Sequence, residues 1–385
     1  MQNIADRLSP TGLWAAYDHI GGLHGKTPLI NFGTIHQDGY NVVLYVKMDT
    51  LKSGGSFKDR GAEYNIHEAV NGSLLKEGDS IVTASAGNHA KGVAKAAKEH
   101  GLKALIYMSS DAPNSKIEGT RKLGGVVELV DGDYHKAAVE AMEFSSCTGT
   151  FYVPAYEDAN VILGQSTVAT EAIMQLRSLK IRPDFFVSPF GGGGLANGIG
   201  YALRYFDSTG LFMYNDSGKK VYNFAVQAEN FGTMARSFRE GNVLGYIPKG
   251  ETIADGIRVP HASEQMLDLS KIHIDGFFTA TESELKDAIK RVYHSELIRA
   301  LQQKSSEQLQ RQHGFNSHHV NGVSNMNVIE GAAATAFACA FADDKIPYDK
   351  IAQEIYPRKT IVGVVVASGN NIDKKMLEDI LSGRD

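Results

Sequence analysis

Short apolar runs alternate with helix-like segments through the first half of the chain, and this alternation constrains the fold more than any other feature. Each apolar run has the length and composition of a strand, and each segment between the runs has helical spacing. The expected strands are 81–83, 104–108 and 126–130, and the expected helices are 90–100, 115–123 and 134–144. Such alternation builds parallel βαβ units, which bind ligands at the carboxyl ends of their strands.

The same pattern predicts a second α/β layer from the rest of the chain. Its expected strands are 42–48, 184–188, 223–227 and 360–366, with a helix at 167–176. We expect residues 1–40 to be irregular apart from a helix near 13–19. The fold class is therefore α/β with two parallel-sheet domains. The large domain is predicted to comprise 1–49 and 156–385, and the small domain 50–155.

Composition narrows the class of protein. The length of 385 residues suits about two domains, and the net charge of −5 gives no basic footprint for nucleic acid. No run approaches the roughly 18 apolar residues that span a membrane. The start of the chain lacks the basic and apolar segments of a signal peptide. Cys147 and Cys339 lack metal-ligand spacing. We expect a reduced, cytoplasmic protein.

Lys58 is the first candidate for chemistry. It lies in the segment Ser53-Gly54-Gly55-Ser56-Phe57-Lys58-Asp59-Arg60-Gly61-Ala62. A lysine among small residues can reach a ligand, and partial desolvation turns its amine into a nucleophile or a base. Taken alone, the segment also fits a solvated lysine in a glycine turn.

Four consecutive glycines, Gly191, Gly192, Gly193 and Gly194, follow the expected strand 184–188. Such a loop offers backbone N–H groups without side-chain bulk, and a helix that begins near Leu195 would add a favourable dipole for phosphate. A tight turn is the alternative, but it needs fewer glycines. A dinucleotide fingerprint would lie earlier in the chain and would be followed by an acidic residue.

A third motif, Ser85-Ala86-Gly87-Asn88-His89, lies between an expected strand and an expected helix. Its backbone N–H groups and polar side chains suit a carboxylate at a helix N-terminus. The alternative is a simple helix cap by Ser85 or Asn88.

A fourth motif, Ser368-Gly369-Asn370-Asn371, lies near the end of the chain. The four motifs, and the order in which they occur, resemble those of the β-family (fold type II) of pyridoxal-phosphate enzymes. The pattern is closest to that of threonine/serine dehydratases and extends from Thr27 to Asn371. The resemblance implies a tryptophan-synthase-β-like fold with pyridoxal 5′-phosphate between its two domains. Long biosynthetic threonine dehydratases carry a C-terminal regulatory domain, which we do not expect here.

The resemblance also implies roles for individual residues. Lys58 would carry the cofactor as a Schiff base, next to Phe57, and Asn88 would contact the cofactor's 3-oxygen. Ser368 would hydrogen-bond the pyridine nitrogen without holding it protonated, which suits β-elimination. The phosphate would be held by Gly191, Gly192, Gly193, Gly194 and Leu195. The substrate carboxylate would be held by the loop of Ser85, Ala86 and Gly87, with His89 beside it in no catalytic role. No metal-binding residue is expected.

The implied function is a dehydratase (ammonia-lyase) that converts threonine or serine to a 2-oxo acid and ammonia. A cysteine-synthase-like β-replacement enzyme is the alternative, although such enzymes usually have Thr-Ser-Gly-Asn-Thr where this chain has residues 85–89. A non-catalytic ligand-binding regulator is a further alternative, which the presence of Lys58, Asn88 and Ser368 disfavours. The expected partners are a small amino-acid substrate and further copies of the chain, as a homodimer or homotetramer.

Several positions depart from the family pattern. Gly54 replaces a frequent threonine, and Asn370 replaces a glycine. Ala86 stands where serine racemases have the serine that acts as their second acid or base. Ala235 stands at one acidic position of their divalent-ion site, so we expect that site to be absent or weak. The polar stretch 284–320, with three histidines between 313 and 319, is longer than the family's linker. We expect it to form an exposed helix and loop rather than a lid or a metal site.

Overall fold

The computed structural model describes residues 3–211, 219–245, 250–295, 329–355, 360–369 and 374–383. The chain divides into two compact units. Unit 1 comprises Met1–Gly25 and Lys52–Gln165, and unit 2 comprises Lys26–Leu51 and Ser166–Asp385. Within the described ranges, no helix combines the length and the apolar character that a membrane crossing requires.

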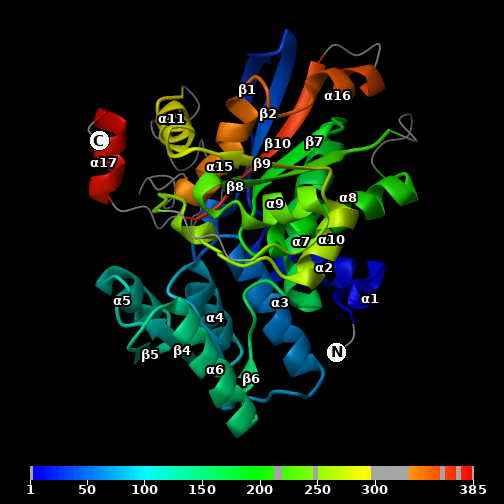
Figure 1. The fold of residues 1–385 in the computed structure, drawn as a ribbon. Coiled ribbons are helices and arrows are strands. Elements are labelled where there is room, and N and C mark those ends of the chain that lie inside the picture. Colours follow the sequence, from blue (N-terminus) through cyan, green and yellow to red (C-terminus); the bar gives the residue numbers. More distant parts are fainter. Residues whose placement is uncertain are drawn as a thin grey trace, which may run out of the picture. The chain divides into compact units, whose positions relative to one another are not determined.

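Unit 1 is built on a parallel sheet with the strand order β5-β4-β3-β6. Its strands are β3 (Ser80–Ala84), β4 (Lys103–Ser109), β5 (Val126–Val130) and β6 (Phe151–Tyr152). Because side chains alternate across a strand, Ile81 and Ile106 pack on one face with α3 and α4, while Val82 and Ala84 pack on the other with α6. The sheet is thus covered by helices on both faces (Figure 1).

The helices of unit 1 begin and end at residues that suit those places. Asp133 accepts from the N–H of Lys136 and so caps α6, which ends at Gly149 in the left-handed conformation. These helices are α1 (Ile4–Arg7), α2 (Pro10–His24), α3 (Lys58–Asn71), α4 (Asn88–Glu99), α5 (Asn114–Lys122) and α6 (Tyr134–Thr148). The division between the units falls within a long helix, α7 (Ala159–Ser178).

Unit 2 contains a six-stranded sheet with the order β1-β2-β10-β7-β8-β9. Only the edge pair β1–β2 is antiparallel. The strands are β1 (Leu29–Gln37), β2 (Tyr40–Met48), β7 (Phe185–Pro189), β8 (Tyr222–Ala228), β9 (Gly276–Ala280) and β10 (Thr360–Ala367). The last strand in sequence, β10, lies between β2 and β7, so the ends of the unit's sequence meet in the middle of its sheet.

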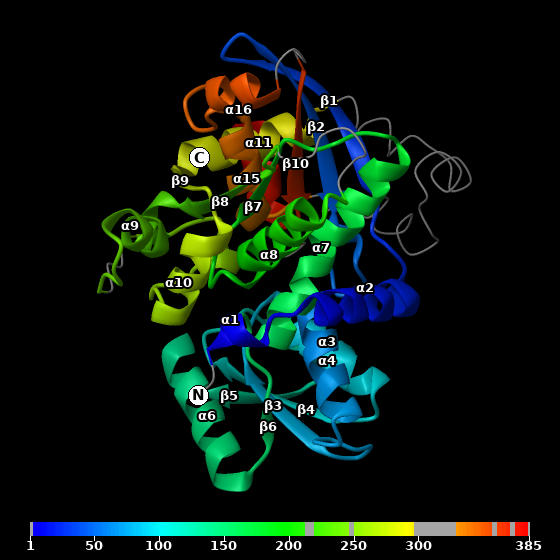
Figure 2. The ribbon, with the colours of Figure 1, turned by 90° about the vertical axis from the view of Figure 1, so that its right-hand side faces the viewer.

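Helices cover both faces of this sheet, with α8 on one face and α15 on the other (Figure 2). Buried alanines of α15 let this helix approach the strands closely, and they join the core that contains Phe185 and Phe224. The helices of unit 2, apart from α7, are α8 (Gly194–Thr209), α9 (Thr233–Glu240), α10 (Glu264–His273), α11 (Glu282–Tyr293), α15 (Gly331–Phe341), α16 (Tyr348–Ile355) and α17 (Lys374–Ser382).

The structure differs from the sequence-based expectation mainly near the N-terminus. Residues 1–40 were expected to be irregular apart from a helix near 13–19. That helix is present within the longer α2, whereas α1 and β1 were not expected. The first 25 residues group with unit 1 rather than with the large domain, because α2 packs on α3 through contacts such as that between the Tyr64 hydroxyl and the carbonyl of Gly12. Of the polar stretch 284–320, the first part forms α11, and residues 296–328 lie outside the described ranges.

Candidate active site

Lys58 is the first residue of α3, and its side chain points into unit 1. Its Nζ donates a 2.6 Å hydrogen bond to the carbonyl oxygen of Ala155 and lies 5.5 Å and 5.9 Å from the ring centroids of Phe57 and Tyr156. Burial lowers the pKa of Lys58 to about 8, because the ammonium loses water that would stabilise its charge. The amine is thus far easier to deprotonate than that of an ordinary lysine.

Two glycines allow the backbone to pack tightly around Lys58. A Cβ atom on Gly92 of α4 would lie 3.1 Å from the carbonyl oxygen of Lys58. On the other side, Asp59 accepts a 2.7 Å hydrogen bond from the N–H of Gly54. A Cβ on Gly54 would collide with this carboxylate, at 2.1 Å from Oδ1. The departure from the family pattern at Gly54 therefore has a local cause.

The Ser85 loop follows β3 and leads directly into α4. The Ser85 hydroxyl accepts from the N–H of Gly87 at 3.1 Å, which folds the loop back on itself. Helix α4 begins at Asn88, and no side chain caps its first turn. The N–H groups of such a turn and the helix dipole together favour an anion, as the sequence analysis expected for the substrate carboxylate.

His89 links this loop to Lys58. Its Nε2 lies 3.1 Å from both the Thr83 hydroxyl and the carbonyl oxygen of Val153. Burial and the nearby charge of Lys58 lower the pKa of His89 to about 3, so the imidazole is neutral. His89 therefore ties β3 and α4 to the segment after β6, and that segment supplies the Ala155 carbonyl that Lys58 contacts. These contacts suit a residue that holds the segment around Ala155 in position.

In unit 2, the glycine loop and Ser368 follow two neighbouring parallel strands. Register pairs Val365 of β10 with Val187 of β7, so both strands end at the same edge of the sheet. Gly193 has a φ of +95°, and a Cβ there would lie 2.6 Å from Cζ of Phe190. Helix α8 begins at Gly194 without a side-chain cap. The loop thus presents backbone N–H groups at a helix N-terminus, which suits a phosphate. Leu195 is buried, so only its backbone can contribute to the cradle.

Two buried polar side chains accompany these loops. The hydroxyl of Ser188, near the end of β7, is buried without a hydrogen-bond partner in the described part of the chain. Ser368 is also buried, and the next residue, Gly369, has a φ of +91°. A Cβ on Gly369 would coincide with the carboxylate of Glu330, so Glu330 lies beside the Ser368 turn. Asn370 and Asn371 lie outside the described residues.

The structure therefore brings together Lys58, His89 and the Ser85 loop in unit 1, and the glycine loop and Ser368 in unit 2. Ala155 and Glu330 were not predicted from the sequence. A backbone carbonyl such as that of Ala155 carries no side-chain pattern. Glu330 directly precedes the alanine-rich stretch 331–340, and an acidic residue before such a stretch is the one pattern that would have drawn attention to it.

In unit 1, the half-buried amine of Lys58 suits an aldehyde. In unit 2, the side-chain-free glycine loop suits a phosphate, and the buried hydroxyl of Ser368 suits a ring nitrogen. With the mixed α/β fold, these residues are typical of an enzyme that holds its cofactor through a lysine side chain. The chain belongs to the family described as pyridoxal-phosphate dependent enzymes, whose model matches residues 20–303. Its cofactor is accordingly pyridoxal phosphate.

The chain is similar to several characterised members of this family. The chain is 32% identical over 339 residues to an L-threonine ammonia-lyase of Thermotoga maritima, covering 88% of this chain and 70% of the relative. It is 31% identical over 276 residues to a serine racemase of Schizosaccharomyces pombe, covering 72% and 79%. The structure superposes on threonine deaminase isoform 2 from Solanum lycopersicum with a TM-score of 0.71, at 26% identity, covering 98% and 90% of the two chains. The expected fold is confirmed.

Proposed function

We propose that this enzyme is an ammonia-lyase that eliminates the β-hydroxyl of threonine or serine to give a 2-oxo acid and ammonia. The observation that carries the proposal is the half-buried amine of Lys58, whose pKa is lowered to about 8 and whose charge acts on His89, four residues after Ser85. The similarity to an L-threonine ammonia-lyase supports it. Pyridoxal phosphate, when bound, supplies the electron sink for the charge that develops at the substrate's Cα.

Each residue of the candidate active site has a defined task in this proposal. Lys58 holds the cofactor and, when its amine is free, takes the proton from Cα. A pKa of about 8 suits that exchange near neutral pH. The Ser85–Gly87 backbone and the first turn of α4 bind the substrate carboxylate, and Asn88 contacts the cofactor. The loop Gly191–Leu195 binds the phosphate, and Ser368 meets the ring nitrogen.

The reaction balances without another reactant. The Cα proton passes to Lys58, and the β-hydroxyl leaves as water after it gains a proton. The enamine product tautomerises to an imine and takes up one water, which gives the 2-oxo acid and ammonia. Ser368 would hydrogen-bond the ring nitrogen without holding it protonated. The cofactor would then be a weaker electron sink, which favours loss of the β-substituent.

An amino-acid panel tests the proposal. We expect the enzyme loaded with cofactor to release 2-oxo acid and ammonia in equal amounts from L-threonine or L-serine. Addition of a thiol distinguishes β-replacement, because a replacement enzyme would convert O-acetylserine to a new amino acid without releasing oxo acid. Release of no oxo acid from any hydroxy amino acid would contradict the proposal.

A further inference from the structure

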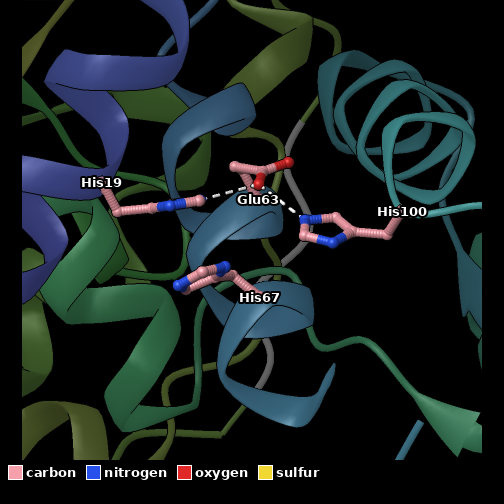
Figure 3. Close-up of side chains that lie close together, drawn as sticks. All are labelled: His19, Glu63, His67 and His100. Carbon is pink, nitrogen blue, oxygen red and sulfur yellow. Dashed lines mark hydrogen bonds and ion pairs between the residues drawn. The ribbon is translucent and has the colours of Figure 1, made fainter. Parts of the chain in front are cut away.

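Three histidines and one glutamate from separate elements of unit 1 form a cluster outside the candidate active site. His19 lies on α2, Glu63 and His67 lie one turn apart on α3, and His100 directly follows α4 (Figure 3). One donor atom from each residue lies within 4.8 Å of the others. Glu63 is at the centre of the group, and its carboxylate points toward the rings of His19 and His100.

The distances are close to those that a bound metal would require. Nε2 of His19 and Nε2 of His100 each lie 2.8 Å from the same oxygen of Glu63, Oε1. With bonds of about 2.0–2.1 Å, tetrahedral Zn²⁺ sets its ligand atoms roughly 3.3 Å apart. The two 2.8 Å contacts would therefore lengthen by about 0.5 Å, and the longest separation between donor atoms would shorten. Side-chain rotations can supply both changes.

The charges of the cluster also point to a cation. The side chain of Glu63 is 1% exposed, and its second oxygen, Oε2, is buried without a hydrogen-bond partner in the described part of the chain. The rings of His19 and His67 stack with centroids 3.5 Å apart, an arrangement that two imidazolium ions would oppose.

We propose that His19, Glu63, His67 and His100 bind one Zn²⁺ ion in a closed, structural site. Three imidazoles and one carboxylate are the ligand types that zinc accepts, whereas Mg²⁺ and Ca²⁺ prefer sets of oxygen ligands. Four protein ligands leave no open position for a substrate, so the site is structural. The amide nitrogen of Asn71 lies 2.7 Å from Nε2 of His67 and helps to hold that ring in place.

The site would join three helices at one point. It would tie α2, from the first 25 residues, to α3 and to the end of α4. Lys58 begins the same helix that carries Glu63, so the metal would also help to fix the orientation of α3. No metal site was predicted from the sequence. The Glu63 and His67 spacing of four residues on one helix is a metal-ligand pattern, but their partners are distant in sequence.

Zinc binding to the full-length, tag-free enzyme loaded with cofactor tests the proposal. After treatment with a chelator and desalting, we expect the protein to bind one Zn²⁺ per chain and to gain a higher Tm. The informative variant is His67→Gln, because it removes a ligand while leaving both contacts of Glu63 with His19 and His100. It should lower zinc affinity by more than about 100-fold, given that loss of outer-shell partners alone typically costs about 10–100-fold.

A matched control and a second metal complete the experiment. His135→Gln changes an exposed histidine of α6 in the same unit and should keep stoichiometric zinc. Co²⁺ in place of zinc should give the visible absorption of a tetrahedral site in the parent protein and in His135→Gln, and not in His67→Gln. Failure of the parent protein to bind one zinc would overturn the proposal and leave an ion-pair network around Glu63. Unchanged zinc affinity in His67→Gln would also overturn it.

Discussion

The amine of Lys58 donates a 2.6 Å hydrogen bond to the carbonyl oxygen of Ala155, and this contact joins two parts of unit 1. A carbonyl accepts from an ammonium without neutralising it, so burial still lowers the pKa of Lys58 to about 8. His89 holds the same segment through the carbonyl of Val153. The geometry thus keeps the lysine oriented and easy to deprotonate.

The first prediction concerns the pH dependence of cofactor uptake. Only the neutral amine attacks an aldehyde, and its fraction grows about tenfold per pH unit below the pKa. For Lys58, the rate at which cofactor-free enzyme takes up pyridoxal phosphate should rise with pH and level off above about 8. Stopped-flow absorbance measures this rate. N-acetyl-lysine, the matched free amine, should keep rising toward its ordinary pKa of about 10.4. If the rate of cofactor uptake by the enzyme also kept rising toward pH 10.4, Lys58 would not be desolvated.

The second prediction concerns the glycine loop. Gly193→Ala places a methyl group at a φ of +95° and 2.6 Å from Phe190, so the loop must shift. Affinity for pyridoxal phosphate should fall much more than affinity for pyridoxal, which lacks the phosphate. Gly210→Ala at the other end of α8 is the control, because its φ is +66° but its Cβ would meet open space. Both variants carry left-handed strain of about 1–2 kcal/mol. An equal loss of affinity for the two ligands in Gly193→Ala would refute the loop's role.

The strands and helices of residues 80–148 could be predicted because each is encoded in a local pattern of apolar residues. Strand β1 could not, since its antiparallel pairing with β2 depends on a tertiary contact that no local pattern announces. Likewise, motifs predicted Lys58, Asn88 and the glycine loop as site residues. The His19–Glu63 and His100–Glu63 contacts were not predictable, because they join residues 44 and 37 positions apart in sequence that belong to different elements.

The third prediction separates the lyase from a racemase, which the similarity to a serine racemase makes a specific concern. Ala86 has no proton to transfer, and the neighbouring Ser85 hydroxyl is engaged with the N–H of Gly87. We therefore expect L-serine in deuterated water to yield oxo acid with little D-serine. Chiral chromatography measures the two products. Ala86→Ser should increase the D-serine fraction, and a D-serine rate in the unmodified enzyme comparable to that of oxo acid would contradict this account.

The fourth prediction concerns acid stability. Folded His89 has a pKa of about 3 against a usual 6.5, so the unfolded chain binds one more proton between these values. Stability due to this group is therefore constant above about pH 6.5 and falls by about 1.4 kcal/mol per pH unit below it. His89→Gln, which keeps a donor for the Val153 carbonyl, should show a shallower loss of stability between pH 6.5 and 4 in urea unfolding. Parallel curves for the two proteins would mean that His89 is not buried in its neutral form.

The assignment of Lys58 as the residue that holds the cofactor can be tested by covalent trapping. Borohydride reduces the bond between a lysine and pyridoxal phosphate to a stable linkage, which mass spectrometry of peptides can locate. We predict a single labelled lysine, Lys58, in the parent protein and in Lys98→Ala, an exposed control on α4. Lys58→Ala should lose the label and lower oxo-acid release by about 10²–10⁴-fold through loss of the base alone. Stoichiometric labelling of any other lysine in the parent protein would contradict the account.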